Sequence, residues 1–277
     1  MKKLLIWYIL LVGYINGAGT DPVFGENGMV VSTSRQASIA GIEILKKGGN
    51  AIDAACATGF VLAVTSSSNG NVGGGGFMVV HKADSTIFTL DYREIAPAAA
   101  HQDMFLDSNS EVIDNMSLRT RAASGVPGSV DGLLKAWKDH GSGNISRREL
   151  LASAIALAER GFELSHYEAQ RFNNNKDLFL KNKAAAKIFI REDRKPWKAG
   201  DRFIQKDLSR TLKRISRDGR DGFYTGKTAD LIIAEMNRGI GLITHEDLLK
   251  YESKYRDPII GSFKGYDIIS MGLPSSG

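Results

Sequence analysis

Cysteine is almost absent from this sequence, because Cys56 is the only one among 277 residues. One cysteine cannot form a disulfide within its own chain, so a fold held together by disulfides is excluded. Cys56 stands among apolar residues at helical spacing, and no histidine follows it at a spacing typical of thiol enzymes. A catalytic thiol is the alternative, but the pattern favours a small buried apolar side chain.

Signatures of several common sites are missing as well. No two of the five histidines lie at i and i+4, and H-E-x-x-H is absent, so we expect no metal site. There is no G-x-S-x-G turn for a nucleophilic serine. Phe77 rather than lysine follows the glycines 73–76, and a strand pattern rather than a helix pattern comes next. Both a phosphate loop and a dinucleotide loop are therefore excluded.

The sequence also lacks a strong charge of either sign. It holds 36 Lys and Arg against 31 Asp and Glu, a formal net charge of +5, which becomes +3 without the two lysines of the first 18 residues. That excess is too small to indicate nucleic-acid binding, so we expect no nucleic-acid partner. The charged blocks at 191–198 and 213–220 mix both signs, and we interpret them as solvated faces.

The longest apolar run is at the N-terminus. Lys2 and Lys3 precede the apolar residues 4–12, and small residues occur at 13–18, which is the pattern of a secretory signal peptide. The run is short for a transmembrane helix, and an uncleaved anchor is the alternative. We expect residues 1–18 to be a signal peptide and residues 19–277 to form part of one exported domain, either periplasmic or extracellular.

Capping residues and apolar spacing predict the elements that follow. Helices are expected at 34–47, 50–64, 102–106, 129–140, 146–160, 165–180, 206–217, 227–237 and just after Thr244. Strands are expected at 28–32, 77–80, 87–90, 259–263 and 266–270. Small residues in the second helix predict close packing against a sheet. Because the chain stops in a loop straight after the last strand, we expect the sequence to be incomplete.

Residues 69–98 form the stretch around which a site is expected. Gly73–Gly76 precede the first strand of a predicted hairpin, and Arg93 follows the second. We expect the glycine loop at one end of this hairpin and Arg93 at the other. Consecutive glycines indicate positive φ or a close approach of backbones. A tight turn without a ligand and a substrate-binding loop are equally good interpretations of them.

Arg93 is the candidate binding residue. Its guanidinium is planar and offers a fork of N–H groups that matches a carboxylate. At the end of an apolar strand its charge is poorly solvated, which favours binding of an anion. The alternative is an ion pair with the neighbouring Asp91 or Glu94, and spacing alone does not decide between the two.

Six short segments carry a wider pattern: GGNAIDAA at 48–55, GNVGGGGFM at 70–78, DYREIAPA at 91–98, SGVPGSV at 124–130, GLIT at 241–244 and PSSG at 274–277. Together they resemble the γ-glutamyltranspeptidase family, also called glutathione hydrolases, and the match runs from about Gly28 to the last residue. The loop at 66–71, SSSNGN, departs from the family, in which many members carry a histidine or a proline there.

The resemblance implies an α+β fold, an αββα sandwich of the N-terminal-nucleophile hydrolase type. It implies an exported precursor that cuts itself into a large and a small subunit. The new N-terminal threonine of the small subunit attacks the γ-amide of glutathione, and its own α-amine can act as the base. Water, an amino acid or a peptide then accepts the γ-glutamyl group. No metal or organic cofactor is needed.

The resemblance also implies a role for Arg93. In the family, the arginine of the D-[FY]-R-E motif binds the α-carboxylate of the γ-glutamyl group, and Arg93 stands at that position. The nucleophilic threonine and the oxyanion glycines belong to the small subunit, beyond Gly277. We therefore expect no catalytic residue in this chain and no activity from it alone. A β-lactam acylase, a polyglutamate-cleaving relative and a truncated remnant are the alternatives.

Overall fold

The computed structural model describes residues 22–276, so the predicted signal peptide at 1–18 and Gly277 of the last motif lie outside the described residues. The helices are α2 (Arg35–Lys46), α3 (Ala51–Thr65), α4 (Met116–Arg119), the 3₁₀ helix η1 (Arg121–Ala123), α5 (Ser129–His140), α6 (Arg147–Arg160), α7 (His166–Asn174), α8 (Lys176–Leu180), α9 (Lys183–Phe189), α10 (Lys206–Asp218), α11 (Asp221–Tyr224), α12 (Gly226–Met236) and α13 (His245–Lys250). The strands are β1 (Phe77–His81), β2 (Ile87–Asp91), β3 (Phe162–Glu163), β4 (Arg202–Phe203), β5 (Lys254–Arg256), β6 (Ile259–Phe263) and β7 (Tyr266–Ser270). In the described part of the chain, no helix combines the length and the apolar character needed to cross a membrane.

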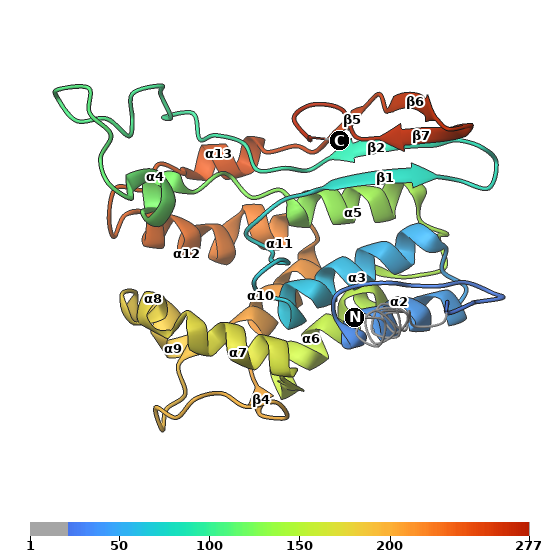
Figure 1. Ribbon diagram of the computed structural model, residues 1–277, viewed down its shortest axis with the longest axis horizontal. Coiled ribbons are helices and arrows are strands. Elements are labelled where there is room, and N and C mark those ends of the chain that lie inside the picture. The colour runs from blue at the N-terminus through green and yellow to red at the C-terminus, as the bar shows by residue number, and fades with distance from the viewer. Residues whose placement is uncertain (1–21, 277) are drawn as a thin grey trace, which may run out of the picture.

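The strands form three antiparallel sheets. The main sheet has the order β1–β2–β5, while β3 pairs with β4 and β6 pairs with β7. In Figure 1 the main sheet and the β6–β7 hairpin lie along the top of the molecule, with α5 and then α3 beneath them. Helices α6 to α9 lie farther from the main sheet (Figure 1). The main sheet and the β6–β7 hairpin are thus segregated from α6 to α9, while the short β3–β4 pair lies beside these helices, and the predicted α+β class is confirmed.

The register of the β1–β2 hairpin corrects one prediction. Phe77 lies opposite Asp91, and Gly76 and Tyr92 extend the pairing by exchanging backbone hydrogen bonds of 3.2 and 3.0 Å. An antiparallel pair brings the start of its first strand against the end of its second. The glycine loop and Arg93 therefore lie at the same end of the hairpin, and the prediction that they occupy opposite ends is wrong.

Several helix starts are confirmed by their caps. The side chain of the N-cap residue accepts a backbone N–H, and the acid three positions later accepts the N-cap N–H, in the pairs Asn50/Asp53, Ser146/Glu149 and Thr244/Asp247. These bonds satisfy N–H groups that the first turn of a helix leaves without partners. Helix α5 begins at Ser129, as the predicted range 129–140 requires, and its N-cap is Gly128.

Other local predictions are wrong. Residues 28–32 form no strand, because they make no backbone hydrogen bond within the described part of the chain. Residues 102–105 form turns rather than a helix, and Leu106 makes an isolated bridge to Val112. The helix predicted at 165–180 is divided at Asn175, whose side chain donates to the carbonyl of Arg171 at 2.9 Å. Strands β3, β4 and β5 have no more than three residues each and were not predicted.

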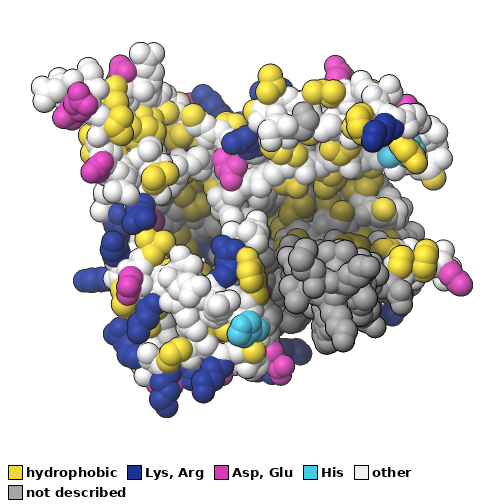
Figure 2. All heavy atoms as spheres, viewed as in Figure 1, with side chains coloured by type: hydrophobic (Ala, Val, Ile, Leu, Met, Phe, Trp, Pro, Cys, Tyr) yellow, Lys and Arg dark blue, Asp and Glu magenta, His cyan; other side chains and the backbone are white. Residues whose placement is uncertain are grey.

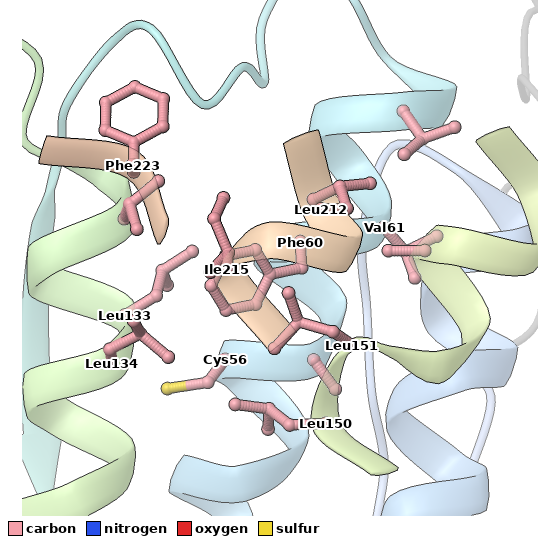
Figure 3. Packing of buried hydrophobic residues seen from close by; sticks show 14 of the residues in the cluster. Cys56, Phe60, Val61, Leu133, Leu134, Leu150, Leu151, Leu212, Ile215 and Phe223 are labelled. Carbon is pink, nitrogen blue, oxygen red and sulfur yellow. The ribbon is translucent and has the colours of Figure 1, made fainter. Parts of the chain in front are cut away.

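The hydrophobic core is centred on α3, most of whose residues are buried. Its main contacts are with α2, α5 and α6, so the predicted packing against a sheet is wrong. A helix that is apolar on all sides can be enclosed by other helices. Figure 3 shows Cys56 pointing toward Leu134 of α5, and Phe60 beside Ile215 of α10. Burial raises the pKa of the Cys56 thiol far above its ordinary value, which confirms that this side chain serves as buried apolar volume.

Candidate functional site

Three of the sequence motifs meet at one end of the β1–β2 hairpin. A β-carbon on Gly75 would lie 2.5 Å from the carbonyl oxygen of Tyr92. The carbonyl oxygen of Gly74 accepts the N–H groups of Gly128 and Ser129 at 2.8 and 2.9 Å. The glycine loop thus lies against both DYREIAPA and SGVPGSV. None of its four glycines has a positive φ, so glycine is required here for close approach.

Two buried side chains fix the main chain of Arg93. The carboxylate oxygen Oδ1 of Asp91 accepts the N–H of Arg93 at 3.0 Å. The hydroxyl of Tyr251 donates to the carbonyl oxygen of Arg93 at 2.9 Å. Asp91 is 8% exposed and Tyr251 is 2% exposed, so neither anchor is free to move into solvent. The backbone that carries the guanidinium is therefore held before any ligand arrives.

The side chain of Arg93 is exposed and forms no ion pair within residues 22–276. Asp91 instead pairs with Arg256, at 2.7 Å between Oδ2 and Nε. Nη1 of Arg93 donates to the carbonyl oxygen of Pro274 at 3.0 Å, which brings the DYREIAPA and PSSG motifs together. The internal ion pair with Asp91 or Glu94 that the sequence left open is not formed there. The guanidinium therefore keeps N–H donors for an anion.

A cavity of about 490 Å³ opens beside Arg93. Gly73 and Arg93 line it, together with the apolar side chains of Pro97, Met104 and Phe105. A charge at the edge of an apolar wall interacts more strongly with an opposite charge than it would in water. The cavity can therefore hold a small molecule by one anionic group while the rest of the molecule contacts apolar surface.

A larger depression of about 630 Å³ is lined by Tyr251, and some of its charged groups are already paired. Asp131 binds Arg220 at 2.8 Å and the hydroxyl of Ser253 at 2.6 Å. Tyr224 stacks on Tyr251 with ring centroids 5.7 Å apart. These contacts support Tyr251, and we assign no ligand to this depression.

Burial also keeps the tyrosine hydroxyls of this region protonated. It raises the pKa of Tyr92 to about 12. It raises the pKa of Tyr251 well above the ordinary value, and the nearby charges of Asp131 and Asp91 add to the effect. Tyr251 is therefore a hydrogen-bond donor to Arg93 at neutral pH. Within residues 22–276, no group of three or more His, Cys, Asp or Glu side chains is arranged to hold a metal ion.

The sequence singled out Arg93 and the glycine loop, and the structure brings them together. The α-carboxylate ligand of Arg93 stays a prediction, as does the absence of a catalytic residue from the chain. Sequence reasoning missed Tyr251 and Arg256, which hold Arg93 and its neighbour Asp91. Tyr251 lies 158 residues from Arg93 and belongs to no recognised motif, so no local signal could have found it.

Comparisons with known proteins agree with these motifs. The sequence model of the family described as Gamma-glutamyltranspeptidase matches residues 37–277. The glutathione hydrolase proenzyme of Pseudomonas sp. (strain A14) is 42% identical over 263 residues, which are 95% of this chain and 45% of that protein. The chain thus spans about half the length of the curated relatives it matches.

Solved structures agree as well. Helicobacter pylori γ-glutamyltranspeptidase is 41% identical with a TM-score of 0.89, and the match covers 92% of this chain and 73% of that chain. The γ-glutamyltranspeptidase from Pseudomonas nitroreducens, complexed with L-DON, is 42% identical with a TM-score of 0.84, covering 91% and 73%. CapD, a transpeptidase of Bacillus anthracis, is less similar, at 30% identity and a TM-score of 0.74, covering 93% and 78%. The predicted fold type is confirmed, and the chain belongs to the γ-glutamyltranspeptidase family.

Proposed function

We propose that the full-length protein is a glutathione hydrolase and γ-glutamyltransferase made as a proenzyme, and that this chain supplies the arginine that binds the γ-glutamyl group. One observation carries the proposal. The backbone of Arg93 is fixed by Asp91 and Tyr251, while its guanidinium borders a cavity and has no carboxylate partner among residues 22–276. A γ-glutamyl group presents a free α-carboxylate, which a guanidinium can bind through two parallel N–H···O bonds. The names of the most similar relatives support glutathione as the substrate.

The bond-breaking chemistry belongs to a threonine outside these residues, at the N-terminus of a small subunit cut from the same precursor. Its hydroxyl attacks the γ-carbonyl carbon, and its α-amine takes the proton. The amide C–N bond breaks, and the leaving amine departs with that proton. Water, an amino acid or a peptide then takes the γ-glutamyl group from the acyl-enzyme. This scheme uses no metal or organic cofactor and leaves the present chain inactive alone.

The role of Arg93 in this scheme is positioning. Binding the α-carboxylate fixes one end of the γ-glutamyl group, so the γ-carbonyl is held at a set distance from the guanidinium. A fixed orientation of the reacting carbonyl is a large part of the rate that a nucleophilic enzyme achieves. Other γ-glutamyl compounds share that carboxylate and should bind in the same way.

The same proposal includes export. Residues 1–18 have the pattern of a signal peptide, which supports a periplasmic or extracellular location.

Steady-state kinetics with a γ-glutamyl p-nitroanilide tests the role of Arg93. We expect Arg93→Gln to lower kcat/KM about 100-fold, mainly through KM, because a charged partner of a carboxylate is lost. Arg93→Lys should lower kcat/KM by a smaller factor, because lysine keeps the positive charge but lacks the two parallel N–H donors of the guanidinium. Arg119 is exposed and forms no ion pair within residues 22–276, so Arg119→Lys is a matched control.

Gel analysis of subunit formation must accompany the kinetics, because a precursor that fails to cleave itself would also lose activity. An unchanged kcat/KM for a fully cleaved Arg93→Gln protein would refute the assigned role. Glutathione, γ-linked polyglutamate and a β-lactam amide should be compared as substrates. Relatives that are 42% and 40% identical to this chain are named glutathione hydrolase, so we expect glutathione to be preferred over polyglutamate. A preference for polyglutamate would contradict glutathione as the substrate, but it would leave the proposed role of Arg93 intact.

A further inference from the structure

A basic surface on α8, α9 and the segment after them has no part in the proposed reaction. Residues 176–198 contain eight Lys and Arg and three Asp and Glu, while the rest of the chain contains 28 of each sign. The whole formal excess of +5 is therefore concentrated in this one stretch, which we call the basic segment. Figure 2 shows Lys and Arg side chains gathered at the lower left of the molecule, where Figure 1 places α7, α8 and α9.

Most cations of the basic segment have no acidic partner. Six of the eight are exposed and form no ion pair within residues 22–276: Lys176, Lys181, Lys183, Lys187, Arg194 and Lys198. Only Arg191 and Lys195 are paired, both of them with Asp193, and Arg191 also with Asp201. The acidic residues at 191–198 therefore neutralise only part of the positive charge of the basic segment. The cations of α8 and α9 stay available for an external anion.

An aromatic cluster holds the basic segment in place. The rings of Phe179 in α8 and Phe189 in α9 are stacked with centroids 4.7 Å apart. The ring centroid of Phe189 also lies 5.2 Å from that of Phe172 and 5.9 Å from that of Phe203. The indole N–H of Trp197 donates to the carbonyl oxygen of Phe189 at 2.7 Å. This aromatic packing holds the backbone that carries the cations. Binding a partner therefore requires little further ordering of that backbone.

Aliphatic side chains stand between the cations. Leu178 and Leu180 of α8 are 44% and 42% exposed, and Ile188 of α9 is 42% exposed. These two short helices also carry lysines of the basic segment. Single exposed aliphatic residues are ordinary, but here they coincide with unpaired lysines. Apolar side chains flanked by Lys and Arg are the composition of segments that lie in a membrane interface. A nucleic acid would engage the cations through its phosphates and leave these aliphatic side chains in water.

We propose that the basic segment, residues 176–198, is a docking surface for a bilayer that contains anionic lipids. The lysines would lie among phosphate headgroups, and Leu178, Leu180 and Ile188 would enter the acyl boundary. Each cation near such a surface strengthens binding roughly fivefold at physiological salt. In Figure 1, α8 and α9 lie away from the main sheet, so docking leaves the cavity beside Arg93 open. The proposal does not depend on the γ-glutamyl reaction.

Vesicle cosedimentation of the full-length protein tests this surface. The vesicles contain phosphatidylglycerol and phosphatidylcholine, or phosphatidylcholine alone. We expect the triple variant Lys181→Gln, Lys183→Gln, Lys187→Gln to partition onto the anionic vesicles about 100-fold more weakly. The control triple variant Lys47→Gln, Lys138→Gln, Lys227→Gln removes the same charge from exposed positions elsewhere and should partition as the native protein does. Every protein keeps the same N-terminus, so residues 4–12 contribute equally.

A second variant separates the apolar contribution from the charge. Leu180→Ser with Ile188→Ser should weaken partition several-fold and keep its dependence on salt. Equal losses in the two triple variants would overturn the proposal, as would equal binding to both kinds of vesicle. Retention on soluble polyglutamate or DNA without partition onto vesicles would show that the surface takes a polyanion instead. Thermal unfolding curves would verify that every variant is folded.

Discussion

The hydroxyl of Tyr251 donates a hydrogen bond to the carbonyl oxygen of Arg93 at 2.9 Å, across 158 residues of sequence. The ring of Tyr251 is buried and stacks on Tyr224, whose own hydroxyl donates to the carbonyl of Pro127 at 2.8 Å. Tyr251 therefore links the helical core to the backbone of the candidate ligand-binding arginine. Because it acts on Arg93 through this bond, we treat Tyr251 as a positioning residue.

Replacing Tyr251 by phenylalanine should separate positioning from simple stability. Tyr251→Phe leaves the Arg93 carbonyl without its donor, so we expect a stability loss of about 1 kcal/mol. We also expect KM for a γ-glutamyl anilide to rise several-fold with kcat little changed. Tyr255→Phe is the control, because that hydroxyl donates to Asp139 at 2.9 Å and does not contact Arg93. Equal rises of KM in both variants would show that Tyr251 has no special link to Arg93.

The close approach at Gly75 predicts a large effect of one methyl group. In Gly75→Ala the β-carbon would lie 2.5 Å from the Tyr92 carbonyl oxygen. The β-carbon is bonded directly to the main chain and the oxygen belongs to it, so neither can move aside alone. We expect a loss of about 1–3 kcal/mol in the free energy of unfolding, measured with urea. Gly261→Ala in β6 is the matched control, because no atom lies within 4 Å of its β-carbon. A Gly75→Ala protein as stable as the control would contradict this packing.

The ion pair of Asp91 and Arg256 can be measured by a double-mutant cycle. Asp91→Asn and Arg256→Gln remove the 2.7 Å contact that joins β2 to β5. Since Arg256 is partly exposed, we expect a coupling free energy of about 0.5–1 kcal/mol rather than the value of a fully buried pair. The exposed pair Lys82–Asp84, at 3.3 Å, serves as the comparison and should give a coupling near zero. Equal coupling free energies in the two pairs would contradict a specific stabilising link between β2 and β5.

Asp247 should make stability depend on pH. Burial opposes its ionisation, but hydrogen bonds from the N–H of Ala98 and from Thr244 outweigh it and hold the pKa of the carboxyl below the ordinary value. A folded-state pKa below the unfolded one stabilises the protein above about pH 4, and this stabilisation is lost as the pH falls through the folded-state pKa.

Urea unfolding of the native protein and of Asp247→Asn at several pH values measures this effect. The native protein should be the more stable of the two at neutral pH, and the difference should shrink below about pH 4. A difference that is constant with pH would show that the charge of Asp247 contributes nothing.

Local signals in the sequence predicted the elements that form through local bonds. The capping pairs at Asn50, Ser146 and Thr244 each involve residues three positions apart, so one short window contains the whole interaction. The β6–β7 hairpin was predicted for the same reason, because its strands adjoin a two-residue turn. Residue pattern singled out the glycine loop and Arg93, whereas the α-carboxylate role of Arg93 came only from the family resemblance.

The remaining features depend on partners that lie far along the chain. Residues 254–256 are too few to signal a strand, and they form β5 because β2 offers its edge. Residues 28–32 have strand composition, but no segment in the described part of the chain pairs with them through backbone hydrogen bonds. The placement of Arg93 beside the glycine loop follows from the antiparallel pairing of the predicted hairpin, a consequence that the prediction of opposite ends overlooked.

The hydrogen bond from Arg93 to Pro274 spans 181 residues, which has a consequence for synthesis on the ribosome. Arg93 emerges long before Pro274, and β2 emerges long before its neighbour β5. During that interval the helices of the core can associate, while one side of β2 has no strand beside it and is open to non-native pairing. On a nascent chain the core helices α2 to α6 can therefore associate before the contact between Arg93 and Pro274 forms.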